Sequence, residues 1–229
     1  MSNPPNTTAA GRRDQPSNAE QTRVALIHAA LTLFGARGFE GASTRDIAAG
    51  ARANIGSIAY HFGGKEGLRA ACAAYIVETV QGVAAQALAT APETLDADGA
   101  RVQLEIALER MVAFIVARPE AGEIVRFLLR ELSHPTSALD TIYKGVFEPV
   151  HARLCLLWSI ATGEPVDEAR TKITVFTLIG QVVYFRIGRE AVMRRMGWTE
   201  IGPDESAQVL AVARDNLRAI LASRTGGRP

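Results

Sequence analysis

Apolar residues recur at helical spacing along most of the chain, and no stretch shows the alternating, β-branched pattern of a strand. One apolar stripe covers residues 24–34 and ends at Gly38, a residue that commonly stops a helix. Pro119 and Pro135 mark further helix boundaries in the second half of the chain. The sequence therefore predicts an all-α fold of about nine helices.

The most apolar helix is expected over Ala169–Met196, where its middle is apolar on nearly all sides, as in a helix buried between neighbours. Its central stretch, Ile173–Ile187, is interrupted by threonine, glutamine and arginine and falls short of the roughly 20 apolar residues that a membrane span needs. Another helix begins at Thr136, and Pro149 is expected to kink or interrupt it. No contact with a membrane is expected.

The ends of the chain and its cysteines restrict the kind of protein further. Residues 1–18 and 224–229 are poor in apolar side chains and are expected to be disordered tails, without the apolar core of a secretory signal. Cys72 and Cys155 lie far apart in apolar runs, which favours buried free thiols over a disulfide. Cysteine and histidine are not clustered as in a zinc site. A cytoplasmic protein without a metal or cofactor is therefore expected.

The segment Ser43–Leu68 carries most of the functional information. It contains two short helices joined by a tight turn, which are too small to bury an apolar face alone and need the preceding helix, with Ile27 and Phe34, as a third side. This is the arrangement of a helix-turn-helix, in which the second short helix enters the major groove of DNA. With a formal net charge of +1, DNA binding has to come from such a local surface and not from a general basic field.

The residue types in this segment fit contacts to DNA. Asn54 and Ser57 open the second short helix and are small and polar enough to read base edges. Phosphate contacts, which position a protein without reading sequence, are expected at the far end of that helix and at the start of the preceding one. The expected DNA contacts are Thr44, Arg45, Asn54, Ile55, Gly56, Ser57, Tyr60, His61 and Lys65.

This stretch resembles the DNA-binding domain of the TetR family of bacterial regulators. The resemblance is carried by the residue runs FGARGF at 34–39, TRDIA at 44–48 and YHFGGKEGL at 60–68, and together these cover about residues 20–70. It implies a helix-turn-helix domain at residues 19–65 and a larger helical domain for ligand sensing and dimerisation at residues 66–223. The run RELSHPT at 130–136, followed by the helix with Pro149, resembles the CecR-like subfamily.

Two positions depart from the family pattern. Arg52 stands where the family usually has the glycine of the turn. Either Arg52 is held in a left-handed conformation, at a cost of about 1 kcal/mol, or the turn is rearranged around Gly50. Ala59 replaces a tyrosine that frequently contacts phosphate in the family, so this one contact is expected to be missing.

The larger domain is expected to hold a small-molecule effector among its apolar side chains. The resemblance implies a cavity there, and apolar pockets use a few polar groups to orient their ligand. An Arg–Glu pair on a helix surface and aromatic residues of the core are the alternative interpretations of the same side chains. The expected lining residues for a hydrophobic or amphipathic effector are Phe114, Phe127, Arg130, Glu131, Phe147, Gln181, Tyr184 and Phe185.

The last two helices are expected to form a homodimer. Gly180 and Gly188 cost about 1 kcal/mol each in a helix relative to alanine, and a close approach between helices would compensate for this cost. A two-fold dimer would place two recognition helices on an inverted-repeat operator. The overall expectation is a ligand-responsive repressor that is not an enzyme. The alternatives are a helical enzyme or ligand carrier that does not read DNA, and a DNA-binding protein that senses no ligand.

Overall fold

The computed structural model describes residues 17–87 and 95–225, so most of the predicted tails, at residues 1–16 and 226–229, lies outside the described residues. Every regular element in the described part of the chain is a helix, as predicted. The N-terminal helices are α1 (Asn18–Gly41), α2 (Thr44–Gly50), α3 (Gly56–Phe62) and α4 (Lys65–Ala87). The others are α5 (Ala97–Val112), η2 (Ala113–Ala117), α6 (Glu120–Ser133), α7 (Ser137–Ile142), η3 (Tyr143–Phe147), α8 (Glu148–Thr162), α9 (Ala169–Ile187), α10 (Arg189–Met196) and α11 (Pro203–Thr225).

The structure divides two of the predicted helices. The helix expected over Ala169–Met196 breaks at Gly188 into α9 and the short, exposed α10. The helix expected from Thr136 becomes α7 and α8 with the π-helical segment η3 between them, and Pro149 lies in the first turn of α8. A proline is tolerated there because its missing N–H would have had no partner within the helix. A second π-helical segment, η2, continues α5.

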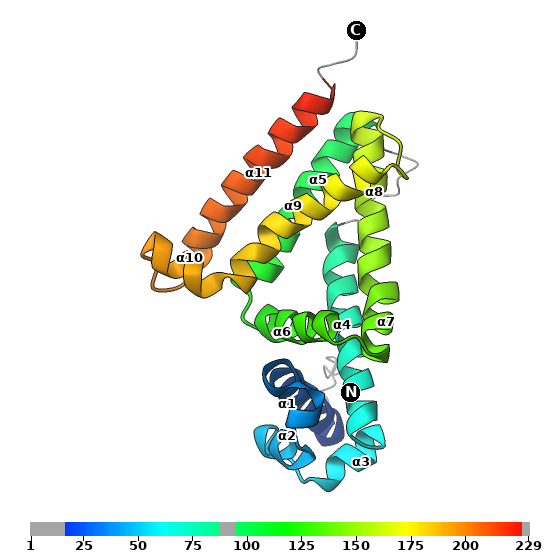
Figure 1. The fold of residues 1–229 in the computed structure, drawn as a ribbon, viewed down its shortest axis with the longest axis vertical. Coiled ribbons are helices and arrows are strands. Elements are labelled where there is room, and N and C mark those ends of the chain that lie inside the picture. The colour runs from blue at the N-terminus through cyan, green and yellow to red at the C-terminus, as the bar shows by residue number, and fades with distance from the viewer. Residues whose placement is uncertain (1–16, 88–94, 226–229) are drawn as a thin grey trace, which may run out of the picture.

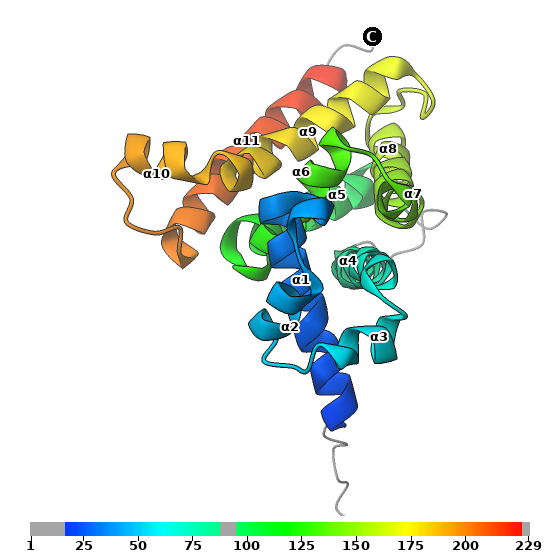
Figure 2. The same ribbon diagram turned by 60° about the horizontal axis from the view of Figure 1, so that its bottom comes forward.

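The helices form a small head and a larger body. In Figure 1, α1, α2 and α3 lie at one end, and α4 runs from α3 into the body formed by α5, α8, α9 and α11. Helix α6 crosses the molecule between α1 and that body, while α10 stands away from the head (Figure 2). Helix α4 begins at Lys65 and packs on both the head and the body, so the domain boundary at residues 65–66 stays a prediction.

The core consists of two apolar clusters, and the first of them joins the head to the body. It contains Leu31 and Ile47 of the head together with Ile124 and Phe127 of α6 and Ile142 of α7. The second cluster packs α5, α8, α9 and α11 together around the fully buried Trp158. The head therefore shares its core with α6 and α7 and does not pack as a separate unit.

Both cysteines are buried free thiols, as the sequence predicts. The Cys72 thiol lies 3.7 Å from the carbonyl oxygen of Ile27, and burial raises the pKa of this thiol far above its ordinary value. Burial also raises the pKa of Cys155. Since the thiolate is the reactive form, neither cysteine is activated as a nucleophile in this fold.

Candidate DNA-binding head and ligand cavity

The turn between α2 and α3 keeps the helix-turn-helix form although it lacks the expected glycine. Arg52 has a φ of 53°, while Gly50 remains the last residue of α2, so the alternative turn around Gly50 does not form. The N–H of Ala53 bonds to the carbonyl of Ala48 at 2.9 Å, and that of Arg52 bonds to Ala49 at 3.0 Å. These two bonds are the Schellman pattern that ends a helix, with arginine at its left-handed position.

This geometry predicts that Arg52→Gly stabilises the protein by about 0.5–1 kcal/mol, because strain is removed at a position that already has the glycine conformation. The change is measured as the free energy of unfolding in a denaturant titration. Ala51→Gly is the matched control, because Ala51 has an ordinary right-handed conformation. This substitution should lower the free energy of unfolding by about 0.5–1 kcal/mol, since glycine loses more conformational freedom on folding. If both substitutions lowered the free energy of unfolding by the same amount, Arg52 would not be strained.

The start of α3 presents the residues expected to face DNA. Tyr60 is 82% exposed and Ile55 is 51% exposed, whereas Ile58 is turned inward and is 2% exposed. The side-chain oxygen of Asn54 accepts the N–H of Gly56, the first residue of α3, at 2.8 Å. Asn54 is exposed, and the contact of its amide NH₂ with a base stays a prediction. Ser57 lies half-buried one turn before the Tyr60–His61 pair, whose rings are in edge contact.

The remaining expected phosphate contacts lie around this surface. Ser43 caps α2 by accepting the N–H of Asp46 at 3.0 Å, and Thr44 and Arg45 form the first turn of that helix. The ammonium group of Lys65 lies 4.3 Å from the centre of the Phe39 ring. This is cation–π distance, and the contact of Lys65 with phosphate stays a prediction.

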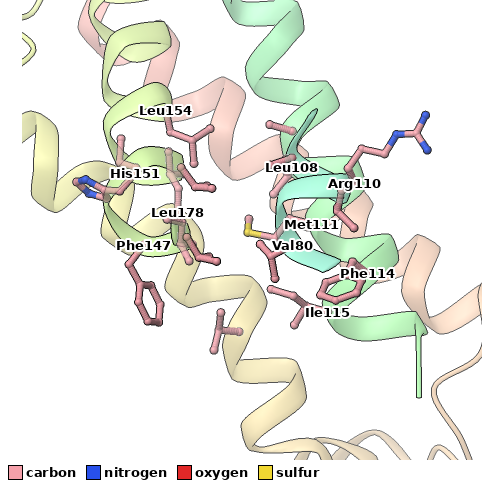
Figure 3. A pocket seen from close by; sticks show the side chains of 18 of the residues that line it. Val80, Leu108, Arg110, Met111, Phe114, Ile115, Phe147, His151, Leu154 and Leu178 are labelled. Carbon is pink, nitrogen blue, oxygen red and sulfur yellow. The ribbon is translucent and has the colours of Figure 1, made fainter. Parts of the chain in front are cut away.

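An apolar cavity of about 330 Å³ lies in the body and reaches several helices. Helix α5 contributes Leu108 and Met111, and the two π-helical segments contribute Phe114 and Phe147 (Figure 3). Isolated π turns occur frequently at functional sites, and here both of them line the same space. The cavity falls within the size range of small-molecule sites. Its other lining residues are Val80, Val83, Ala84, Leu104, Ala107, Arg110, Ile115, Ile124, Val125, Leu128, Leu129, Leu132, Val146, Val150, His151, Leu154, Val175, Phe176, Leu178, Ile179, Val183, Ile187 and Leu217.

Of the eight residues expected to line the cavity, the structure brings only Phe114 and Phe147 to it. Phe127 is 1% exposed and packs in the core shared by α1 and α6, where its ring centre lies 6.5 Å from that of Phe34. Glu131 is buried and accepts a hydrogen bond from the hydroxyl of Thr136 at 2.6 Å. The other four, which are Arg130, Gln181, Tyr184 and Phe185, also lie outside the lining of this cavity.

The other four residues that were expected to line the cavity lie elsewhere in the structure. Arg130 is exposed and packs against Gly38 of α1, which has a φ of 74° and no room for a side chain. Gln181 belongs to α9 and faces α11. Its side-chain oxygen accepts a hydrogen bond from the side-chain amide of Asn216 at 3.1 Å. Tyr184 is 58% exposed on α9, and Phe185 packs against the second apolar cluster. The cavity therefore gives these residues no ligand contact, and a role for them stays a prediction.

A polar network that no sequence motif predicts joins the head to α6. Glu123 of α6 accepts a hydrogen bond from the Thr32 hydroxyl at 2.9 Å and lies 3.4 Å from the His28 ring nitrogen. The other ring nitrogen of His28 lies 3.3 Å from the Tyr75 hydroxyl of α4. Close by, Gly35 of α1 packs directly against the backbone of α6. Helix α6 thus touches the cavity on one face and the head on the other.

A second contact joins the cavity wall to α4. Gly145 of η3 packs so closely on α4 that an added Cβ would lie 2.7 Å from the methyl groups of Val77. The side-chain amide of Gln81 donates a hydrogen bond to the Gly145 carbonyl at 3.0 Å. A shift of η3, which also carries the lining residue Phe147, has to move α4 as well because no space separates them.

Two kinds of site are not found in the described residues. No group of three or more histidine, cysteine, aspartate or glutamate side chains there is arranged to hold a metal ion. No helix in the described part of the chain is long and apolar enough to cross a membrane.

Sequence comparisons match both parts of the chain to known bacterial regulators. Residues 26–72 match the family described as "Bacterial regulatory proteins, tetR family", and residues 100–224 match the C-terminal domain of "HTH-type transcriptional dual regulator CecR". The chain is 32% identical over 208 residues to that regulator from Shigella flexneri, covering 88% of this chain and 92% of the relative. It is 29% identical over 121 residues to the regulator YttP of Bacillus subtilis, covering 53% of this chain and 55% of YttP.

Solved structures agree on the fold. The crystal structure of AibR in complex with isovaleryl coenzyme A and operator DNA matches with a TM-score of 0.60 at 17% identity, covering 89% of this chain and 98% of AibR. A TetR-like regulator from Rhodococcus sp. RHA1 matches with a TM-score of 0.59 at 19% identity, covering 94% of this chain and all of the other. With both of its parts matched and a relative similar over nearly its whole length, the chain belongs to the TetR family of bacterial regulatory proteins and carries a CecR-type C-terminal domain.

Proposed function

We propose that this protein is a ligand-responsive transcriptional regulator, acting as a repressor, that binds an inverted-repeat operator as a homodimer in the cytoplasm. The observation that carries the proposal is the direct packing of a helix-turn-helix head against α6 and α4, two walls of an apolar cavity. The same architecture binds isovaleryl coenzyme A and operator DNA in AibR. A helical enzyme is disfavoured because the relatives are named as transcriptional regulators.

The exposed face of α9 and α11 supports the homodimer. Ile173, Tyr184 and Ile187 of α9 are all more than half exposed and lie on one side of the helix. Between them, Gly180 has open space where a Cβ would be. In the described residues, the buried side-chain nitrogen of Gln181 has no hydrogen-bond partner. A second copy packed on this face would cover the apolar stripe, whereas the Gln181 nitrogen is already buried within one chain.

The mechanism follows from the two contacts between cavity and head. A ligand that enters the cavity displaces α6 and η3, which carry the head through α1 and α4. In a dimer such a displacement changes the spacing of the two recognition helices. Only a ligand that prefers one spacing shifts the balance, by about 1–3 kcal/mol in typical cases.

The first test is selection of bound fragments from a random pool of duplex DNA by the purified protein. An enriched inverted repeat is expected, because a two-fold dimer presents the same helix to each half-site. Enrichment of a single half-site would remove the homodimer from the proposal. Weak, salt-sensitive binding without any enrichment would remove sequence-specific DNA binding.

On the selected operator, Tyr60→Phe and Lys65→Ala should weaken binding about equally for all sequence variants, by roughly 1 kcal/mol each, since phosphate contacts carry no sequence information. Asn54→Ala and Ser57→Ala should instead change the preferred base at one position per half-site, by about 1–3 kcal/mol. Fluorescence anisotropy with a set of single-base operator variants measures both effects.

Asn54→Asp is the control for helix capping, since it keeps the oxygen that accepts the Gly56 N–H and removes the amide donors. Like Asn54→Ala it should abolish the base preference that the amide donors create, without loss of helix stability, but its negative charge should also weaken binding to every operator. The distinction between residues that position the protein and residues that read bases would be wrong if both groups of variants lost the same affinity for every operator.

A further inference from the structure

The wall of the cavity is almost entirely hydrocarbon. Within the described part of the chain, Arg110 and His151 are the only lining residues whose side chains carry nitrogen or oxygen. The thioether of Met111 is at most a weak acceptor. Most ligand sites place a few polar groups among their apolar walls to orient the ligand, so the use of these two side chains decides what the cavity can bind.

Arg110 and His151 are both directed away from the cavity. Arg110 is exposed, and Figure 3 shows its guanidinium group and the His151 ring turned away from the space between α5 and α8. One ring nitrogen of His151 lies 3.1 Å from the Lys172 carbonyl oxygen, and the other lies 3.6 Å from the sulfur of the buried Cys155. Neither lining residue therefore presents a free polar atom to a ligand in the interior.

The two π-helical segments are the other source of polar atoms, because carbonyl groups at the end of a helix lack partners within it. At the end of η2, Arg186 of α9 donates hydrogen bonds to the carbonyls of Ile115 at 2.6 Å and Val116 at 3.0 Å. In η3, the Gly145 carbonyl accepts the side-chain amide of Gln81 from α4 at 3.0 Å. Side chains of the protein thus already occupy these carbonyls.

Polar atoms that are buried without a partner lie elsewhere in the described residues. They belong to α9 and α11, and none of their residues lines the cavity: Gln181, Ser206, Arg214 and Arg224. A ligand hydroxyl or amide in the interior would therefore lose its water and gain no hydrogen bond, and an ionised group would lose more. The wall selects against both.

We infer that the effector of this cavity is a neutral hydrocarbon-like molecule without a strong hydrogen-bonding group. This inference rests on the proposed function, because it names the chemical class of the effector at the same site. An engineered cavity of about 150 Å³ holds benzene, so about 330 Å³ suits an aromatic or alicyclic molecule of roughly a dozen non-hydrogen atoms. Such a molecule binds through apolar burial and through its contacts with the wall.

The experiment compares naphthalene, 1-naphthol and 1-naphthoate by isothermal titration calorimetry on the full chain. The three probes share one ring system and carry no polar group, a hydroxyl and a carboxylate. Naphthalene should bind most tightly. 1-Naphthol should bind about tenfold more weakly, because its hydroxyl finds no partner, and 1-naphthoate about a hundredfold more weakly or less, because an ionised group costs more to bury.

Variants locate the bound ring system. Ala107→Leu adds a larger side chain to the wall and should lower naphthalene affinity by about tenfold. Val102→Leu is the matched control on α5, since Val102 is 57% exposed and does not line the cavity, and it should leave this affinity unchanged. Arg110→Gln should change the affinity for none of the three probes. The comparison of probes on the original chain stands even if Ala107→Leu does not fold.

The inference would be overturned if 1-naphthol or 1-naphthoate bound as tightly as naphthalene, or if none of the three bound. Tight binding of 1-naphthoate that is lost with Arg110→Gln would assign the cavity to an anion instead. These outcomes are separate from the proposed function. An enriched operator without naphthalene binding removes only the ligand class, whereas naphthalene binding without an enriched operator removes only the reading of DNA.

Discussion

Gly67→Ala is expected to lower the free energy of unfolding by about 3 kcal/mol and to weaken operator binding by tenfold or more, roughly the loss of one base contact. A Cβ at Gly67 would fall on the carbonyl oxygen of Phe62, the last residue of α3. The clash is with backbone, which cannot rotate away as a flexible side chain would. Helix α3 must therefore separate from α4, and the recognition surface moves with it. Denaturant unfolding and fluorescence anisotropy on the selected operator measure the two effects.

Gly82→Ala is the matched control on the same helix. Gly82 has nothing within 4 Å of an added Cβ, so the substitution should stabilise α4 by about 1 kcal/mol and leave operator affinity unchanged. The pair separates the general effect of replacing a helical glycine from the specific contact between α3 and α4. If Gly67→Ala were as stable as Gly82→Ala and bound the operator normally, the close packing of these two helices would be wrong.

The head could be predicted from the sequence because its signals are local. The caps, glycines and short spacing between Ser43 and Leu68 predict two short helices joined by a tight turn, and the structure confirms them as α2 and α3. The sequence does not decide between a left-handed Arg52 and a turn rearranged around Gly50. A local pattern identifies the position that needs a left-handed residue, but only the packing of α3 against α1 and α4 decides whether the chain accepts the strain.

The cavity lining could be predicted only in part, because helical periodicity shows that a residue is apolar and not which neighbour it faces. Helix α6 is the clearest example, since it is buried on two sides. Ile124 and Leu128 line the cavity, whereas Phe127, between them, packs with α1. From the sequence alone, these two apolar directions look like one broad stripe.

The π-helical segments add a second difficulty. Each inserts a wider turn, so a stripe extrapolated at 3.6 residues per turn points to the wrong side beyond it. The segment η2 carries the lining residues Phe114 and Ile115 at the end of α5, and η3 carries Val146 and Phe147 before α8. The network of His28 and Glu123 was also beyond prediction, because 95 residues separate them in the chain.

Phe127→Ala is expected to lower the free energy of unfolding by about 3–5 kcal/mol, the usual cost of emptying the space of a buried phenylalanine. Phe127 is 1% exposed and lies where α1 meets α6, next to Gly35. The cavity that remains would loosen the contact through which a ligand in the body acts on the head. Reduced coupling between effector binding and operator release should accompany the loss of stability, whereas effector affinity itself should change little because Phe127 does not line the cavity.

Phe127→Leu separates packing from ligand contact. It keeps most of the buried volume and should cost less than about 1.5 kcal/mol, so the variant stays folded and its effector binding can be compared directly with that of the original chain. Since the head and α6 share one apolar cluster, the leucine variant, which keeps most of this packing, should also keep most of the coupling between the cavity and the head. A leucine variant of normal stability that binds the effector several-fold more weakly would instead place the Phe127 ring against the ligand.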